Sequence, residues 1–167
     1  MSGVVDRFQT VISGLRNWAR LRPMPVRAAA DAVPRALAVM GEGPGRDALQ
    51  VVFRDAGWQL VIVDNSTSAI MRQQNEAWPI ILYERELTGR GWRQAVSLFS
   101  RLSPRPCVVL LSCSSDKNLW DELVRCGGFD LLRTPVDRDA VLRTVRAGWA
   151  IWQNRLSPRL VATANHN

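Results

Sequence analysis

Histidine and cysteine are scarce in this chain of 167 residues, which limits the chemistry that it can support. Its three cysteines, Cys107, Cys113 and Cys126, form no C-x-x-C pair, and the one histidine is His166. A structural zinc site needs about four closely placed cysteine or histidine ligands, and an activated cysteine needs a base beside it. We therefore expect no metal site, no cofactor and no enzymatic activity, and we expect free thiols in a reducing compartment.

Long apolar runs are missing as well. No stretch of about 18 apolar residues occurs, so the sequence predicts no membrane span. Charged residues interrupt the first 20 positions, where a secretory signal would need a continuous apolar stretch. Apolar residues still make up 47% of the chain, which is enough for a hydrophobic core. A cytoplasmic location is the expectation that follows.

Lysine is nearly absent, because Lys117 is the only one and every other basic residue is arginine. The formal net charge of +7 is concentrated at the ends of the chain. Residues 1–35 contain six arginines against two aspartates, and residues 154–167 add two arginines, so the segment between them is close to neutral. The basic flanks leave open the alternative of a nucleic-acid-associated accessory regulator. No helix-turn-helix or RNA-binding motif supports that alternative.

Short apolar runs alternate with amphipathic stretches between residues 36 and 153, which predicts alternating strands and helices. Continuous apolar strands that alternate with helices indicate a parallel sheet covered on both faces. We therefore predict an α/β, flavodoxin-like (βα)5 doubly wound sheet with strand order 2-1-3-4-5. The strands are expected at 36–40, 58–63, 78–83, 107–112 and 129–132, and the helices at 47–56, 66–77, 92–102, 116–126 and 136–154.

Two of the predicted helices, at 116–126 and 136–154, carry residues with a specific expected role. Ser114 or Ser115 is expected to cap the 116–126 helix. On the last helix, Trp149 and Trp152 are three residues apart, and they either form a dimer contact or pack against their own sheet. The residues of the 116–126 helix predicted to face the core are Leu119, Trp120, Leu123 and Val124.

An extension of 35 residues precedes the predicted domain of residues 36–154, and residues 155–167 are expected to form a flexible tail. The apolar residues of the extension recur at steps of four and three, which predicts an amphipathic helix. Three interpretations are open: dimerisation or packing on its own domain, docking on a partner protein, and contact with an anionic membrane surface. The residues of this predicted interaction surface are Val4, Phe8, Val11, Leu15 and Trp18.

Polar segments follow the predicted strands at the edge where doubly wound sheets have their functional crevice. Residues 81–92 (ILYERELTGRGW), the strand end at Ser112, and residues 127–135 (GGFDLLRTP) resemble response-regulator receiver domains. The resemblance covers about residues 36–153. It places Glu84 at the phospho-acceptor aspartate, Ser112 at the hydroxyl that senses the phosphoryl group, and Pro135 at the proline after the fifth strand.

The resemblance also implies which parts of the chemistry are missing. A receiver needs an acceptor carboxylate, two acidic residues after the first strand for Mg²⁺, and a lysine for the phosphoryl oxygens. Here the first-strand loop offers Glu42 alone, the lysine position falls on Thr134, and the aromatic switch position falls on Leu131. Glu84 is interpreted either as a phosphate mimic or as a solvated loop acid beside Arg85.

The sequence therefore predicts a degenerate receiver (a pseudo-receiver) that signals by protein–protein contact, as a homodimer or with another protein, without phosphorylation or Mg²⁺ binding. An enzyme that binds a flavin or a nucleotide on the same sheet is the weaker alternative. Residues 41–46 (GEGPGR) lack the third glycine of a dinucleotide-binding fingerprint. Residues 112–116 lack the G-x-S-x-G pattern of a nucleophile elbow.

Overall fold

The computed structural model describes residues 33–87, 91–114 and 116–156, which form five strands and five helices in alternation. The N-terminal stripe from Val4 to Trp18, most of the extension and most of the tail lie outside the described residues. The strands are β1 (Arg35–Val39), β2 (Gln59–Val63), β3 (Ile80–Glu84), β4 (Cys107–Ser112) and β5 (Asp130–Arg133). The helices are α2 (Pro44–Asp55), α3 (Ser66–Asn75), α4 (Trp92–Phe99), α5 (Lys117–Arg125) and α6 (Arg138–Leu156).

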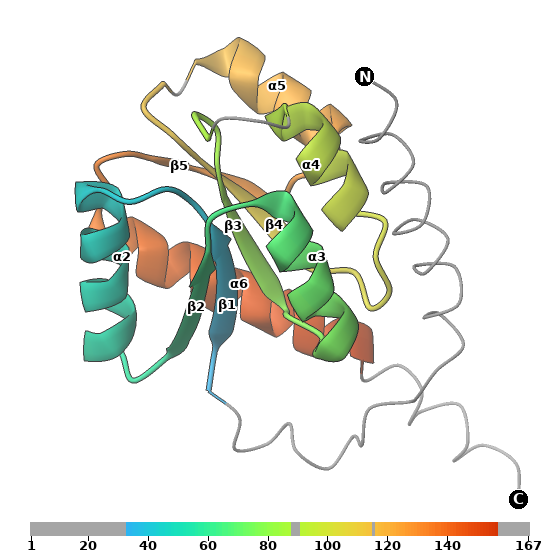
Figure 1. Cartoon of the computed structure of the whole chain (residues 1–167), viewed down its shortest axis with the longest axis horizontal. Helices are drawn as coiled ribbons and strands as arrows, with labels where there is room; N and C mark the ends of the chain where they lie inside the picture. Colours follow the sequence, from blue (N-terminus) through green and yellow to red (C-terminus); the bar gives the residue numbers. More distant parts are fainter. Residues whose placement is uncertain (1–32, 88–90, 115, 157–167) are drawn as a thin grey trace, which may run out of the picture.

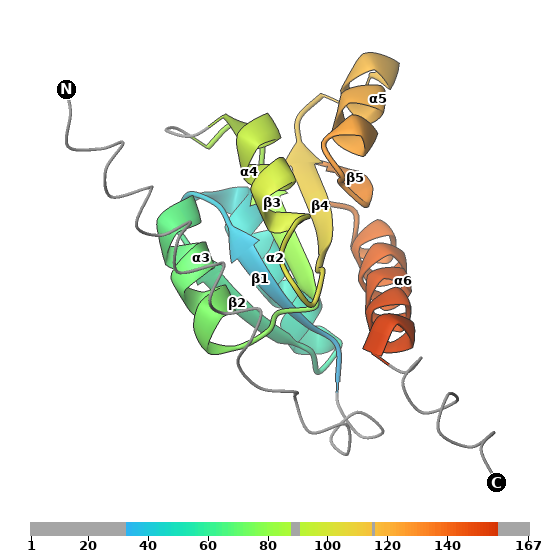
Figure 2. The same ribbon diagram turned by 90° about the vertical axis from the view of Figure 1, so that its right-hand side faces the viewer.

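All five strands form one parallel sheet in the order β2-β1-β3-β4-β5, which confirms the predicted topology (Figure 1). Helices α2 and α6 pack on one face of the sheet, and α3, α4 and α5 pack on the other (Figure 2). The apolar side chains of the central strands alternate between these two layers, as the two-residue period of a strand requires. Leu37 and Ile81 lie in one layer, while Ala38 and Leu82 lie in the other.

The predicted element boundaries hold to within three residues. Helix α2 begins at Pro44 rather than at Asp47, because proline has a helical φ and lacks the N–H that the first turn leaves unpaired. Strand β3 begins at Ile80, two residues later than expected, since Pro79 cannot donate to a neighbouring strand. Strand β4 has the predicted bounds. No helix in the described segments is long and apolar enough to span a membrane.

The prediction for the buried face of α5 was half wrong. Leu119 and Leu123 are buried, but 40% of Trp120 and 51% of Val124 is exposed. The amphipathic pattern alone could not separate these pairs, because each pair is spaced four residues apart on the same helix. The helix packs against α4 and the edge strand β5, which cover only one of its sides. Its cap is Asp116, whose Oδ1 accepts from the N–H of Leu119 at 2.8 Å, rather than the predicted serine.

Two glycines that follow helices adopt positive φ angles but have different surroundings. Gly57 after α2 has φ +67°, and Gly127 after α5 has φ +88°. A Cβ atom at Gly57 would meet no heavy atom within 4 Å. A Cβ atom at Gly127 would lie 2.6 Å from Oγ and 2.8 Å from Cβ of Ser100. The two positions therefore share the backbone requirement, and only Gly127 adds a close approach to a neighbouring helix.

We expect Gly127→Ala to lower the free energy of unfolding more than Gly57→Ala does. The left-handed conformation costs about 1–2 kcal/mol in either variant, and the clash with Ser100 should add about 1–3 kcal/mol at position 127. Urea denaturation of both variants beside the unchanged protein measures the difference. Equal losses in the two variants would contradict the close packing of Gly127 on Ser100.

Candidate functional site at the carboxyl ends of the strands

The parallel strands β1, β3, β4 and β5 have their carboxyl ends on the same side of the sheet (Figure 1). The predicted site residues lie at or just after these ends. Glu84 ends β3 opposite Leu111 of β4, and Ser112 ends β4. Thr134 follows β5, and its N–H donates to the carbonyl oxygen of Ser112 at 2.9 Å. The structure thus places Glu84, Ser112 and Thr134 at or just after the carboxyl ends of three neighbouring strands.

Glu84 is half-buried, and its carboxylate is engaged by the backbone that follows β1. Its Oε2 accepts from the N–H of Gly41 at 2.8 Å. Met40, the residue before Gly41, is buried in the layer of α2 and α6. The side chain of Glu42 is 95% exposed, and its carboxylate is 3.9 Å from the guanidinium of Arg46. The first-strand loop therefore meets Glu84 with a backbone amide, while its acidic side chain faces solvent.

Ser112 is fully buried, and its hydroxyl takes part in three hydrogen bonds. It donates to Oε1 of Glu86 at 3.2 Å. It accepts from Nη1 of Arg85 at 3.3 Å and from the N–H of Ser114 at 3.1 Å. A hydroxyl has one donor and two acceptor positions, so these partners use its whole hydrogen-bonding capacity. A buried hydroxyl without such partners would be costly.

The carboxylate of Glu86 also contacts Cys113, the residue after Ser112. Its Oε1 is 3.4 Å from the N–H of Cys113 and 3.2 Å from Sγ of the same residue. The hydrogen bond from the thiol to Glu86, followed by repulsion from this carboxylate, raises the pKa of Cys113. Three donors from two consecutive residues thus converge on one carboxylate oxygen.

Arg85 supplies a positive charge that the sequence analysis did not assign to this site. Its N–H donates to the carbonyl oxygen of Leu111 at 2.9 Å, and its guanidinium reaches Ser112. The sequence identified Arg85 only as a neighbour of Glu84, and the signal available was its place directly after a buried strand. Thr134 is half-buried at the predicted lysine position, and Pro135 after it is exposed.

The described residues contain no group of three or more histidine, cysteine, aspartate or glutamate side chains placed to hold a metal ion. The residues next to Glu84 explain this for the magnesium site that the resemblance implies. Mg²⁺ takes oxygen ligands in octahedral geometry, whereas Met40 offers an apolar side chain and Gly41 offers none. Met40 and Gly41 therefore add no side-chain oxygen ligand beside Glu84.

The tryptophans of α6 lie mainly within their own domain. Trp152 is only 4% exposed, and Trp149 is half-buried against the layer of α2 and α6. Their rings stack with centroids 5.7 Å apart and planes at 21°. Of the two interpretations, packing against their own sheet is the one that this burial supports, since little of Trp152 is left for a partner.

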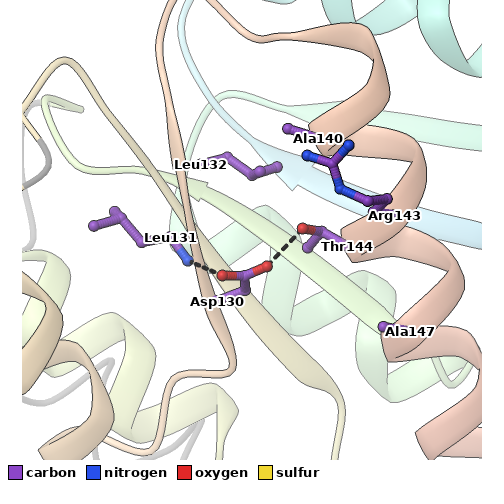
Figure 3. A pocket seen from close by; sticks show the side chains of 7 residues that line it. All are labelled: Asp130, Leu131, Leu132, Ala140, Arg143, Thr144 and Ala147. Atoms are coloured by element: carbon purple, nitrogen blue, oxygen red, sulfur yellow. Dashed lines mark hydrogen bonds between the residues drawn. The ribbon is translucent and has the colours of Figure 1, made fainter.

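A concavity of about 360 Å³ lies between β5 and α6 (Figure 3). Its polar side chains are those of Asp130, Arg143 and Thr144. The Asp130 carboxylate accepts from the N–H of Leu131 at 2.8 Å and from the hydroxyl of Thr144 at 2.5 Å. Both carboxylate oxygens are thus bonded within the domain, and the pair links β5 to α6. The hollow is a structural junction, and Glu84, Ser112 and Thr134 are not among the residues that line it.

Solved structures that resemble this fold include response regulators and receiver domains. A response regulator from Thermotoga maritima is 18% identical with a TM-score of 0.65, over 71% of this chain and 99% of the other. A chemotaxis response regulator of Vibrio cholerae is 17% identical with a TM-score of 0.64, over 70% and 98%. The receiver domain of a Pseudomonas aeruginosa sensor histidine kinase, with a magnesium ion in its active site cleft, is 16% identical with a TM-score of 0.63, over 71% and 99%. No protein-family model matches the chain, and no curated protein matches its sequence.

We expect Asp116→Asn to change how the stability of the protein depends on pH. Hydrogen bonding from the N–H of Leu119 lowers the pKa of Asp116 in the folded chain. A lowered folded pKa adds stability above the unfolded pKa of about 3.9, and this is lost as the pH falls through the folded value. Asparagine is also a good cap, so the variant should keep α5 but lack this acid-sensitive contribution.

Urea denaturation between pH 7 and pH 3 measures this difference. The gap in the free energy of unfolding between the two proteins should be constant near neutral pH and should narrow below about pH 4. A gap that does not change over this range would show that the charge of Asp116 adds nothing to its cap.

Proposed function

We propose that the chain is an atypical receiver-like signalling module that acts by protein–protein contact, without aspartyl phosphorylation, Mg²⁺ binding or catalysis. The receiver-domain fold supports the signalling role. The observation that carries the proposal is the surroundings of Glu84. Its carboxylate is bonded to the backbone amide of Gly41, at the place where phosphoryl transfer needs acidic side chains and a metal ion.

Arg85, whose guanidinium lies beside Ser112, supports the same conclusion. Phosphoryl transfer needs a positive charge free to stabilise the transferred group. Arg85 is instead bonded to Ser112, whose hydroxyl also has Glu86 and Ser114 as partners. The hydroxyl that would sense a phosphoryl group is thus occupied within the chain. The sequence allows Glu84 to be interpreted either as a phosphate mimic or as a solvated loop acid. Its bond to Gly41 and its partial burial disfavour the solvated loop acid. The acid that contacts Ser112, however, is Glu86.

The outer side of α5 is the surface that we assign to protein contact. Trp120 and Val124 are one turn apart on this helix, and both are exposed. Tryptophan is enriched among the residues that dominate binding energy in interfaces. A second copy of this chain is the simplest partner, because one patch on two copies can pair with itself around a two-fold axis.

The first test concerns phosphorylation chemistry. We expect the full chain to give no saturable change in tryptophan fluorescence when Mg²⁺ and beryllofluoride are titrated in, because the acidic pair and the lysine are missing. The triple variant Gly41→Asp/Glu84→Asp/Thr134→Lys adds an acidic residue next to Glu42, an aspartate at the acceptor position and the lysine, and it serves as the positive control. A Cβ atom at position 41 would lie 3.6 Å from Oε2 of Glu84, an ordinary contact, so the backbone there accepts a side chain. Saturable, Mg²⁺-dependent binding by the unchanged chain would refute the proposal.

The second test concerns the contact surface. We expect the full chain to form a dimer, and Trp120→Ser/Val124→Ser to shift it to monomer by removing two apolar anchors. Met71→Ser is the matched control, since Met71 is 58% exposed on α3. Sedimentation equilibrium over a range of concentrations gives the dissociation constant of each protein. An equal dissociation constant for the double variant and the Met71→Ser control would place the dimer contact outside Trp120 and Val124. A monomeric unchanged chain at all concentrations would refute the homodimer.

A further inference from the structure

The end of β4 forms a cradle of hydrogen-bond donors for a single oxygen atom. The cradle consists of the hydroxyl of Ser112 and the N–H of Cys113, which lie 3.2 Å and 3.4 Å from Oε1 of Glu86. The thiol of Cys113 is a third donor at 3.2 Å. Arg85 adds a positive charge, since its guanidinium is 3.3 Å from the Ser112 hydroxyl. Converging donors beside a guanidinium are a typical environment for an anion.

The chain places Glu86 in this cradle through the residues on either side of it. The N–H of Arg85 is tied to Leu111 of β4 at 2.9 Å. The N–H of Leu87 donates back to the carbonyl oxygen of Glu84 at 3.3 Å, which turns the chain immediately after β3. The side chain of Leu87 packs against the layer of α3, α4 and α5. Both neighbours of Glu86 are therefore fixed, and its carboxylate is delivered to the end of β4.

We propose that Glu86 is a built-in anionic ligand of the Ser112–Cys113 cradle, which holds the end of β4 in one hydrogen-bonded state and excludes an external oxyanion. This inference rests on the proposed function and deepens it, because it names the group that is hydrogen-bonded to the Ser112 hydroxyl. Ser112 is fully buried, so its hydroxyl needs an acceptor within the domain. Glu86 is exposed at the surface but belongs to the chain itself, so it supplies that acceptor from within the domain, whereas a phosphoryl group can be added and removed.

Cys113 reports on the contact because it is the exposed one of the three cysteines, while Cys107 is buried and Cys126 is half-buried. Glu86 raises the pKa of this thiol because its carboxylate accepts a hydrogen bond from the thiol and repels the thiolate. Arg85 acts on the thiolate in the opposite direction, and it is unchanged in the variants below. Removal of the charge at position 86 should therefore lower the pKa of Cys113.

The test is the pH profile of iodoacetamide alkylation at Cys113, followed by mass spectrometry on the full chain. Glu86→Gln should shift the midpoint of the profile to lower pH. Glu42→Gln, which removes an exposed acid in the neighbouring loop, should leave it unchanged, and Cys113→Ser should remove the signal. An unshifted Glu86→Gln profile, or an equal shift in Glu42→Gln, would overturn the proposal.

A second measurement tests the exclusion of an external anion. In Glu86→Ala the cradle is open, so inorganic phosphate should slow alkylation of Cys113 in a saturable manner, while the unchanged chain should show no protection. Equal protection in both proteins, or none in either, would overturn the proposal. The beryllofluoride titration of the unchanged chain depends on the acidic pair and the lysine, so its outcome separates failure of the proposed function from failure of this inference.

Discussion

Burial of β1, β3 and β4 on both faces is the constraint on which the rest of the molecule depends. Residues 80–82 and 108–111, for example, are fully buried between the two helical layers. Each such side chain contributes about 1.5–3 kcal/mol to folding when it is a large aliphatic one, and a polar side chain there would need partners that the helices do not offer. Polar chemistry is therefore confined to the loops beyond the strand ends. Two buried hydroxyls, those of Tyr83 and Ser112, lie near the ends of β3 and β4, and neighbouring residues supply the hydrogen bonds of both.

The same constraint explains why the sequence predicted the fold well. Strands buried on both faces are continuous apolar runs, and the run at 107–112 is delimited by Pro106 before it and by polar residues after it, so its bounds were correct. The orientation of α5 could not be predicted in the same way. Its pattern contains two apolar pairs, and only the tertiary packing against α4 and β5 decides which pair is buried.

The candidate site was predictable as a place but not as a set of contacts. Parallel strands bring their carboxyl ends to one edge, so Glu84, Ser112 and Thr134 had to be near one another. A strand continued past Glu84 would point Glu86 to the same side as Glu84. The turn closed by Leu87 ends that alternation, so Glu84 faces Gly41 while Glu86 reaches β4. A turn of this kind is set by packing that the sequence pattern does not reveal.

Response regulators and receiver domains with 16–18% identity share this fold, so the fold is compatible with replacement of most of the residues along the chain. The chemistry of such a domain depends on a few loop residues, so it can be lost while the framework remains. On the proposed function, the carboxylate that accepts from the Ser112 hydroxyl is that of Glu86. It belongs to the chain itself and cannot be removed by hydrolysis. Any signal must then act by changing what the module contacts. A single conformation at the end of β4 then favours binding of a partner. The partner finds the binding-competent conformation fully populated, so its affinity is not reduced by a conformational equilibrium.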